Sequence, residues 1–530
     1  MVALSKLFRF HRRLPPKTVS AMGLLDLPPE LLDLIISFAC RPHSIEGLAL
    51  SCRTVYERAT SQIARHNALK RQWSHTTNTQ GNRRADTLRI VYEIARDPVI
   101  AEYIESLSLW DRRKDDELVD GQDGDTDSFR DDEDAMASIK HLLQHTGYFA
   151  AAGDDSWWHQ LLEEDADDAD EEEGNSDKLY ATMALLALLP SLKTLQLPDK
   201  WHQVRATEAA EELVSAVEAL VSLSRAKDAS QAPLRYLDTI LPFSEEGYDV
   251  RVGLQCLQPF MLLPNLKNLF LVSCIALEDD WAGVQFNWSP SAVHSSLARI
   301  ELACCCVDAQ GLAALVRNTP QLTVFKYSHQ TKWDGLEYDW NPGEFIEVLA
   351  TYCGHQLIDL ALTVDELHGE IVNGLSSFAR FPALQTLEVD ADLFCGPPVE
   401  SGQRRGRDAY VPDGAKEWAY DDIPCLGDML PPNIRTVYLN SDYPEPSQLV
   451  LKALVKNIKD RRCETLLHLE RMVIRQYRSS TAKELCLLHE CILESFDEES
   501  MVPRARAMMP LWKRQFDAFV GGIVSEGFRE

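Results

Sequence analysis

A six-residue motif, apolar–x–x–apolar–x–apolar, recurs along most of the chain and constrains the fold more than any other feature. Looser copies, IESLSL and LRYLDTI, begin at Ile104 and Leu234. In five copies a proline stands two residues before the first apolar residue, and a helix cannot continue through proline. Each copy therefore predicts a short strand that follows the end of a helix. The regular copies begin at Leu192, Leu266, Leu297, Leu322, Leu357, Leu384 and Ile434.

These copies predict a stacked architecture. One strand and one helix cannot bury their apolar faces alone, so neighbouring units must stack, with the strands in a parallel sheet and the motif residues pointing inward. Counted with the looser copy at Leu234, the copies from Leu192 onward begin 25 to 50 residues apart, and the pattern resembles a degenerate leucine-rich repeat. We therefore expect an α/β solenoid, with an irregular leucine-rich-repeat-like array over residues 179–446. Residues 71–110 would supply linker helices and a possible first repeat strand.

The end of the chain shows helical spacing of its apolar residues. The segments SQLVLKALVKNI and LWKRQFDAFVGGIV both fit an amphipathic helix. Because the open end of a repeat array exposes its core, we expect residues 447–530 to form a helical C-terminal cap.

Much of the negative charge of the chain is concentrated in two segments. Residues 111–134 hold 12 acidic and 4 basic residues, and residues 154–177 hold 12 acidic residues and no lysine or arginine, in a chain of net charge −29. Like charges at this density repel, so residues 111–178 are expected to form an acidic, largely disordered insert. The same charge argues against nucleic acid as a partner, because phosphates are bound by lysine and arginine.

The remaining composition favours a reduced compartment and a non-catalytic protein. The basic segment 1–23 is expected to be a disordered tail, with a mitochondrial presequence as the alternative. The longest apolar run is too short to cross a membrane, so no membrane association is expected.

The 13 cysteines form no Cys-x-x-Cys pair, which favours reduced, buried thiols in the cytoplasm or nucleus. Nucleotide, hydrolase and metalloprotease motifs are absent, so we expect no enzyme activity, cofactor or metal.

Residues 24–70 form a separate helical unit with an excess of apolar residues. Leu27, Leu31, Ile35 and Phe38 recur at helical spacing, with Leu34 beside them. Two prolines, 28 and 29, suit the first turn of this helix, and RPH at 41–43 should end it. A second apolar stripe follows over residues 45–56. A unit this small cannot bury all of these side chains, so a partner should cover some of them.

The sequence of this unit resembles the F-box. The signature Leu-Pro-x-Glu-Leu-x-x-x-Ile-x-x-aromatic is carried by residues 27–38, and Leu-x-Leu-x-Cys-Arg by residues 48–53. One departure is Ser51, where an apolar residue is usual. The resemblance implies docking onto a Skp-type adaptor, and through it assembly with a cullin–RING ubiquitin ligase, the SCF complex. It places the adaptor contacts at Leu27, Pro28, Leu31, Leu34, Ile35, Phe38, Leu48 and Leu50.

The function that follows from both regions is recruitment of a target protein to an SCF-type ligase. The F-box-like unit would hold the adaptor, and outward residues of the array would bind a protein substrate that the sequence does not identify. Exposed aromatic and arginine side chains are common binding anchors. Two alternatives are an interaction scaffold without a ligase role, whose helical unit is a cap, and an acidic nuclear chaperone for basic proteins. The combination resembles large fungal families. The candidate substrate contacts are Tyr236, Phe270, Arg299, Lys326 and Tyr438.

Overall fold

The computed structural model divides the chain into two compact units, residues Met1–Gln72 and Trp73–Glu530. The structure describes residues 24–79, 86–110, 129–146, 149, 157–159, 161–162, 179–201, 210–226, 232–277, 284–332, 339–369, 371–372, 374–375, 377–394, 404–405, 425–441, 448–477, 480–496 and 509–527.

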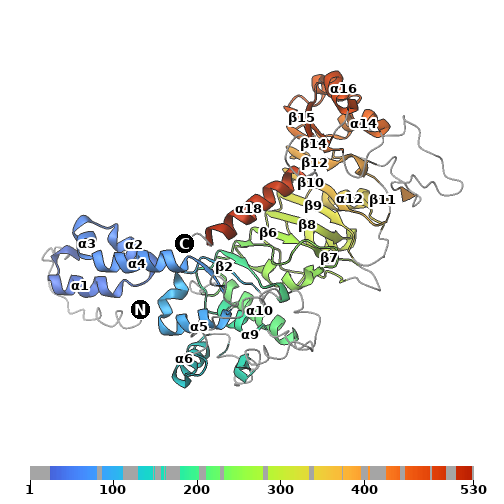
Figure 1. Ribbon diagram of the computed structural model, residues 1–530. Coiled ribbons are helices and arrows are strands. Elements are labelled where there is room, and N and C mark those ends of the chain that lie inside the picture. Colours follow the sequence, from blue (N-terminus) through green and yellow to red (C-terminus); the bar gives the residue numbers. More distant parts are fainter. Residues whose placement is uncertain are drawn as a thin grey trace, which may run out of the picture. The chain divides into compact units, whose positions relative to one another are not determined.

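The first unit is built from short helices (Figure 1). A 3-10 turn, η1 (Leu24–Asp26), precedes α1 (Pro29–Phe38), α2 (Pro42–Ala49), α3 (Arg53–Arg58) and α4 (Thr60–Trp73). As expected from the sequence, Pro28 and Pro29 stand at the start of α1, and Pro42 opens the next helix. A small core forms between the helices. It consists of Leu32, Ile36, Ala39, Ile45, Val55 and Ala59, with Leu48, Cys52 and Ile63 packed against it.

The second unit contains one large sheet in which every strand pair is parallel. The main path runs β1-β2-β3-β4-β6-β8-β9-β10-β12-β14-β15-β16, and β5 joins through β7, which pairs with β8. The strands are β1 (His75–Thr77), β2 (Ser106–Ser108), β3 (Thr194–Gln196), β4 (Thr239–Ile240), β5 (Val252–Gly253), β6 (Asn268–Val272), β7 (Cys274–Ala276), β8 (Arg299–Val307), β9 (Val324–Gln330), β10 (Asp359–Glu366), β12 (Thr386–Asp390), β14 (Thr436–Asn440), β15 (Arg471–Tyr477) and β16 (Ile492–Phe496). A separate antiparallel pair is formed by β11 (Ile371–Val372) and β13 (Arg404–Arg405).

Helices alternate with the strands along the chain (Figure 1). The α-helices are α5 (Thr87–Arg96), α6 (Glu133–Gln144), α9 (Tyr180–Leu186), α10 (Ala210–Arg225), α11 (Ala309–Val316), α12 (Pro342–Tyr352), α13 (Leu426–Met429), α14 (Gln448–Val455), α15 (Ile458–Glu464), α16 (Ser480–His489) and α18 (Leu511–Gly527). Short 3-10 turns are η2 (Pro98–Glu102), η6 (Leu254–Leu257), η7 (Phe260–Leu262) and η8 (Ala391–Leu393). The predicted alternation of helices with parallel strands is therefore confirmed.

The repeated motif sets the register of the sheet. Leu195 is paired with Leu107 on one side and with Ile240 on the other, and this row continues through Leu269 and Ile300. All of these side chains are buried. One motif copy begins at a different residue from the one expected. Ile240 pairs with Leu195 and therefore occupies the second apolar position of the motif, so the copy in LRYLDTI begins at residue 237 and not at 234. The turn before β4 takes up the extra residues.

The sheet extends further at both ends than the sequence suggested. The segment 71–110 contains two strands of the sheet, β1 and β2, where linker helices and one possible strand were expected. At the other end, β15 and β16 continue the sheet inside the segment expected to be a purely helical cap. The helix α18 does not close the end of the array either; it lies across the strands (Figure 1).

The acidic insert is also less uniform than its charge suggested. Residues 129–146 are ordered: Phe129 stacks on Tyr92 of α5 with ring centroids 4.8 Å apart, and Arg130 pairs with Asp86 at 2.9 Å. The carboxylate of Asp132 accepts hydrogen bonds from the first backbone N–H groups of α6, so an acidic residue serves there as a helix cap. In the second segment, the apolar WWHQLL stretch includes buried tryptophans. Residues 111–128 and 163–178 lie outside the described residues, as do residues 1–23.

Candidate functional site

Helix α1 carries apolar side chains on two faces. Leu32 and Ile36 point into the core of the first unit. Four large apolar side chains lie on the opposite face at i, i+3, i+4 and i+7 spacing, which places them on one side of the helix. These side chains remain largely exposed; Leu31 is 47% exposed and Phe38 is 74% exposed. The exposed row, which we call the α1 face, consists of Leu31, Leu34, Ile35 and Phe38.

The other residues predicted for adaptor contact differ in exposure. Pro28 is exposed at the start of α1, and Leu50, just after α2, is 84% exposed. Leu27 is half-buried, and Leu48 packs against the core of the unit, so Leu48 is mainly a structural residue. Sequence reasoning did not include the exposed apolar residues Leu24, Leu25 and Tyr56 among the contacts. Outside α1, the sequence pattern does not distinguish exposed from buried apolar residues.

Ion pairs hold the helices of this unit in place. The guanidinium of Arg58 on α3 donates two hydrogen bonds, of 2.8 and 2.7 Å, to the carboxylate of Asp33 on α1. That bidentate contact lowers the pKa of Asp33. Glu46 on α2 accepts a hydrogen bond from Lys70 on α4 at 2.9 Å, and this contact lowers the pKa of Glu46. The polar contacts thus link α1 to α3 and α2 to α4, and none of them involves the exposed residues of the α1 face.

The second candidate surface is the outward face of the sheet, made by strand residues that alternate with the buried motif residues. Three predicted substrate contacts, Phe270, Lys326 and Tyr438, belong to one row of this face because the strand register aligns them through their neighbours. Tyr438 is half-buried. Tyr236 is exposed but lies in the turn before β4 and not on a strand. The sheet therefore brings together only part of the predicted set.

Lys326 and Arg299 are engaged with acidic neighbours. Glu301 is buried between them: Arg299 donates a 2.6 Å hydrogen bond to its carboxylate, and Lys326 lies 4.0 Å away. Lys326 also pairs with Asp359 at 3.1 Å and is itself buried, against the expectation of an exposed contact. Burial raises the pKa of Glu301, although both cations act in the opposite direction. These charges stabilise one another across β8, β9 and β10.

Phe270 is also buried, at 4% exposure, because α18 covers it. Trp512 and Phe516 of α18 pack on the outward face together with Phe270, and the rings of Phe270 and Phe516 lie 5.9 Å apart. This contact could not be predicted from the sequence, since the amphipathic pattern of α18 indicates burial but does not say against which surface. The apolar residues beneath α18 are Leu241, Phe270, Val272, Ala303 and Ala361.

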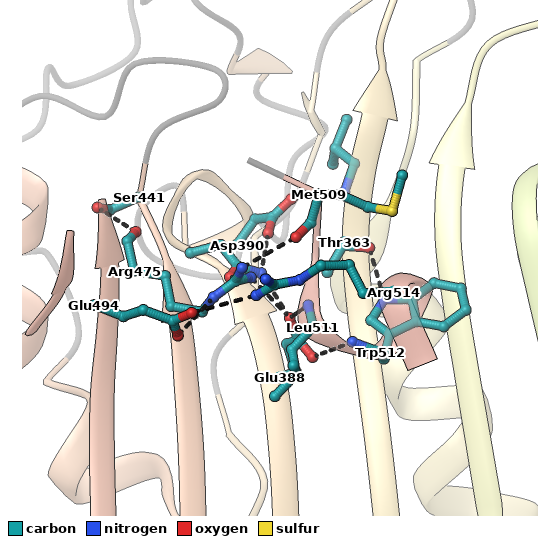
Figure 2. A network of polar contacts seen from close by, with 12 residues as sticks. Thr363, Glu388, Asp390, Ser441, Arg475, Glu494, Met509, Leu511, Trp512 and Arg514 are labelled. Atoms are coloured by element: carbon teal, nitrogen blue, oxygen red, sulfur yellow. Dashed lines mark hydrogen bonds and ion pairs between the residues drawn. The ribbon is translucent and has the colours of Figure 1, made fainter. Parts of the chain in front are cut away.

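A polar network surrounds the start of α18 (Figure 2). The carboxylate of Glu388 on β12 accepts hydrogen bonds from the backbone N–H groups of Leu511 and Trp512, at 2.6 and 3.0 Å. Arg475 on β15 lies 3.5 Å from Glu388 and 3.2 Å from Glu494 on β16. Burial raises the pKa of Glu388, while Arg475 and the two N–H groups oppose that rise. The sheet thus presents an acceptor to the positive end of a helix.

Cysteines gather under the same region without the features of a reactive site. Cys274 of β7 and Cys304, Cys305 and Cys306 of β8 are buried. Burial raises the pKa of Cys306 to about 12, so its thiol stays protonated at neutral pH, whereas nucleophilic cysteines are thiolates. Within the described residues, no group of three or more His, Cys, Asp or Glu side chains is placed to hold a metal ion.

Comparison with known proteins adds no family. Neither the family models nor the curated proteins include a match to this sequence. In the part of the chain that the structure describes, no helix has the length and apolar character to cross a bilayer.

Proposed function

We propose that the chain is a substrate-recruiting subunit of an SCF-type ubiquitin ligase. In this proposal residues 24–70 are an F-box-like unit that docks onto a Skp-type adaptor, and the parallel sheet with its helices is a degenerate leucine-rich-repeat solenoid that binds the target protein. Ubiquitin transfer belongs to other subunits, and the chain contributes proximity. The cytoplasm and the nucleus are the compartments that fit this role.

The α1 face is the observation that carries the proposal. Apolar side chains at i, i+3, i+4 and i+7 are the usual anchors of a helix that lies in a partner's groove. A helix of an isolated unit normally turns such a row toward its own core, but here Leu32 and Ile36 already fill that core. The α1 face is therefore available to a partner, and its residues are those at which the F-box resemblance places adaptor contact.

The test is co-precipitation of a purified Skp-type adaptor with the wild-type chain and with a Leu31→Ala, Ile35→Ala double variant. Each substitution removes apolar area that is already partly buried, so each should weaken docking by about 1 kcal/mol. We expect the double variant to bind the adaptor roughly thirtyfold more weakly than the wild type. A melting curve should show little change, because neither side chain belongs to the core of the unit.

A matched control is available on α16, where Leu487 is 77% exposed and Leu488 is 65% exposed. Their replacement by alanine removes the same kind of side chain from an exposed helix and should leave adaptor binding unchanged. Equal binding by the wild type and the α1 double variant would contradict the proposal. A wild-type chain that does not bind the adaptor would favour the interaction-scaffold alternative.

A further inference from the structure

The sheet, and not the sequence of α18, caps the N-terminus of this helix. Glu388 reaches the first turn from β12 and accepts hydrogen bonds from two of its backbone N–H groups. The first N–H groups of any helix need acceptors, so a carboxylate in this place can receive the start of any helix that lies here. Asn440 on the neighbouring strand β14 and Arg475 on the next strand, β15, hold Glu388 in position.

A second polar position on the sheet receives a lysine. Lys513 is only 3% exposed, although lysine is rarely buried without partners. Its Nζ atom lies 3.0 Å from the carboxylate of Asp365 and 3.2 Å from that of Glu246. Burial alone lowers the pKa of Lys513, but the neighbouring charges outweigh burial and raise it, so the lysine stays charged. The sheet therefore provides an acidic position for one cation.

Two aromatic side chains fill the space between these polar positions. The indole Nε1 of Trp512 donates a 3.1 Å hydrogen bond to the hydroxyl of Thr363, and Phe516 packs beside Phe270. Contact with Phe270 continues beyond Phe516: Phe519 is 45% exposed, but its ring lies 4.9 Å from that of Phe270, and Val520 packs against the same cluster. Gly521 and Gly522 are exposed. The buried side chains of α18 nevertheless follow the pattern Trp–Lys–x–x–Phe, over residues 512–516.

The composition of this contact is that of an interface. Glu388 and Lys513 are buried charged groups that water would solvate well, and a permanently closed core is usually no less stable when such groups are replaced by apolar ones. Aromatic anchors surrounded by polar groups are instead typical of protein recognition surfaces. Glu388 lies in the same row of the outward face as Phe270, Lys326 and Tyr438, three of the residues at which target binding was expected.

We propose that the outward face of the sheet under α18 is a recognition surface for amphipathic helices that present an aromatic residue, a lysine, two further residues and an aromatic residue, and that α18 is the chain's own occupant of this surface. The inference rests on the proposed function, because it names the class of target segment that the array recruits. A target helix of this chemistry replaces α18. A tethered helix competes at a high effective concentration, so α18 also keeps weak ligands out.

The experiment uses the full-length chain with Trp512→Ala, Lys513→Glu and Phe516→Ala, which we call the released variant. A fluorescently labelled peptide with the sequence of residues 509–527 is titrated with the wild type and with the released variant, and binding is followed by fluorescence anisotropy. We expect the released variant to bind the peptide about a hundredfold more tightly than the wild type does. A control peptide with the same three substitutions should bind neither protein.

A charge exchange tests the lysine position separately. In the released variant, Asp365→Lys should abolish binding of the natural peptide, and a peptide with Lys513→Glu should recover part of it. Failure of the released variant to bind the natural peptide would overturn the inference. Loss of its cooperative unfolding would also overturn it, since α18 would then be part of the core of the array.

The adaptor assay separates this inference from the proposed function. The released variant retains the α1 face and should co-precipitate the Skp-type adaptor like the wild type. Peptide binding without adaptor binding would support helix recognition and remove the ligase role. Adaptor binding without peptide binding would leave the ligase role and overturn helix recognition.

Discussion

His329 shows at the scale of one residue how burial fixes a charge state. The side chain is fully buried on β9, its ring stacks on Trp340 at a centroid distance of 4.5 Å, and its Nδ1 atom lies 2.9 Å from the hydroxyl of Tyr327. Burial lowers the pKa of His329 to about 3, and the charge of Lys332 acts in the same direction. The histidine is therefore neutral in the folded chain throughout the physiological range.

This neutral histidine makes stability depend on pH. The unfolded chain takes up a proton at His329 below its ordinary pKa of about 6.5, whereas the folded chain does so only near 3. Falling pH between these values therefore favours the unfolded state. The contribution should amount to roughly 2 kcal/mol between pH 7 and pH 5.

The measurement is urea unfolding of the wild type and of His329→Phe at pH 7 and pH 5. Phenylalanine keeps a ring against Trp340, and the Tyr327 hydroxyl retains its partners at Cys305 and Val307. The variant should lose less free energy of unfolding on acidification than the wild type does. An identical pH dependence in both proteins would show that His329 titrates normally when folded.

At the scale of a single element, the strand register predicts that substitutions at neighbouring residues differ sharply in their effect on stability. Leu195 of β3 is fully buried between Leu107 and Ile240, whereas Thr194 is only half-buried at the start of the strand. Leu195→Asp places a charge in an apolar core without a partner and should cost several kcal/mol, roughly 3 or more. Thr194→Asp should change the free energy of unfolding by less than about 1 kcal/mol. Chemical denaturation of both variants measures the difference, and equal losses would contradict the register.

Most strands could be predicted because the sheet needs the same apolar positions in every unit. Each of the motif copies noted in the sequence contains a strand. The first strand, β1, was missed because His75, Thr76 and Thr77 contain no apolar residue and carry no motif. By contrast, β15 could have been found: Leu469, Met472 and Ile474 follow the same spacing as the other copies. Nearby helical patterns led to the interpretation of that region as a cap.

The candidate sites differ in how far the sequence could predict them. The α1 face follows directly from helical spacing, because the apolar residues of α1 exceed what one side of the helix can bury. The packing of α18 on Phe270 could not be predicted, since it depends on a contact between residues about 240 positions apart in the sequence. Local periodicity describes each element well but does not say which surfaces pack together.

At the scale of the whole molecule, the two compact units have cores of their own. Among the described residues, the core of the first unit consists of residues between 32 and 63, and the second unit has a core formed by the rows of motif residues. A unit with a separate core can unfold independently of its neighbour. Calorimetric unfolding of the full chain should therefore contain two separable transitions.

A substitution in one core should lower the melting temperature of one transition and leave the other unchanged. Ile36→Ala leaves a cavity in the first unit and Leu387→Ala leaves one in the sheet, and each should cost its own unit about 2–4 kcal/mol. The adjacent Ile35→Ala is the control, because Ile35 lies on the exposed α1 face and its loss should leave both transitions near their wild-type temperatures. Differential scanning calorimetry of the three variants reads out both units at once. If Ile36→Ala lowered both transitions equally, the units would unfold together, and adaptor docking at α1 could then no longer be varied independently of target binding on the sheet.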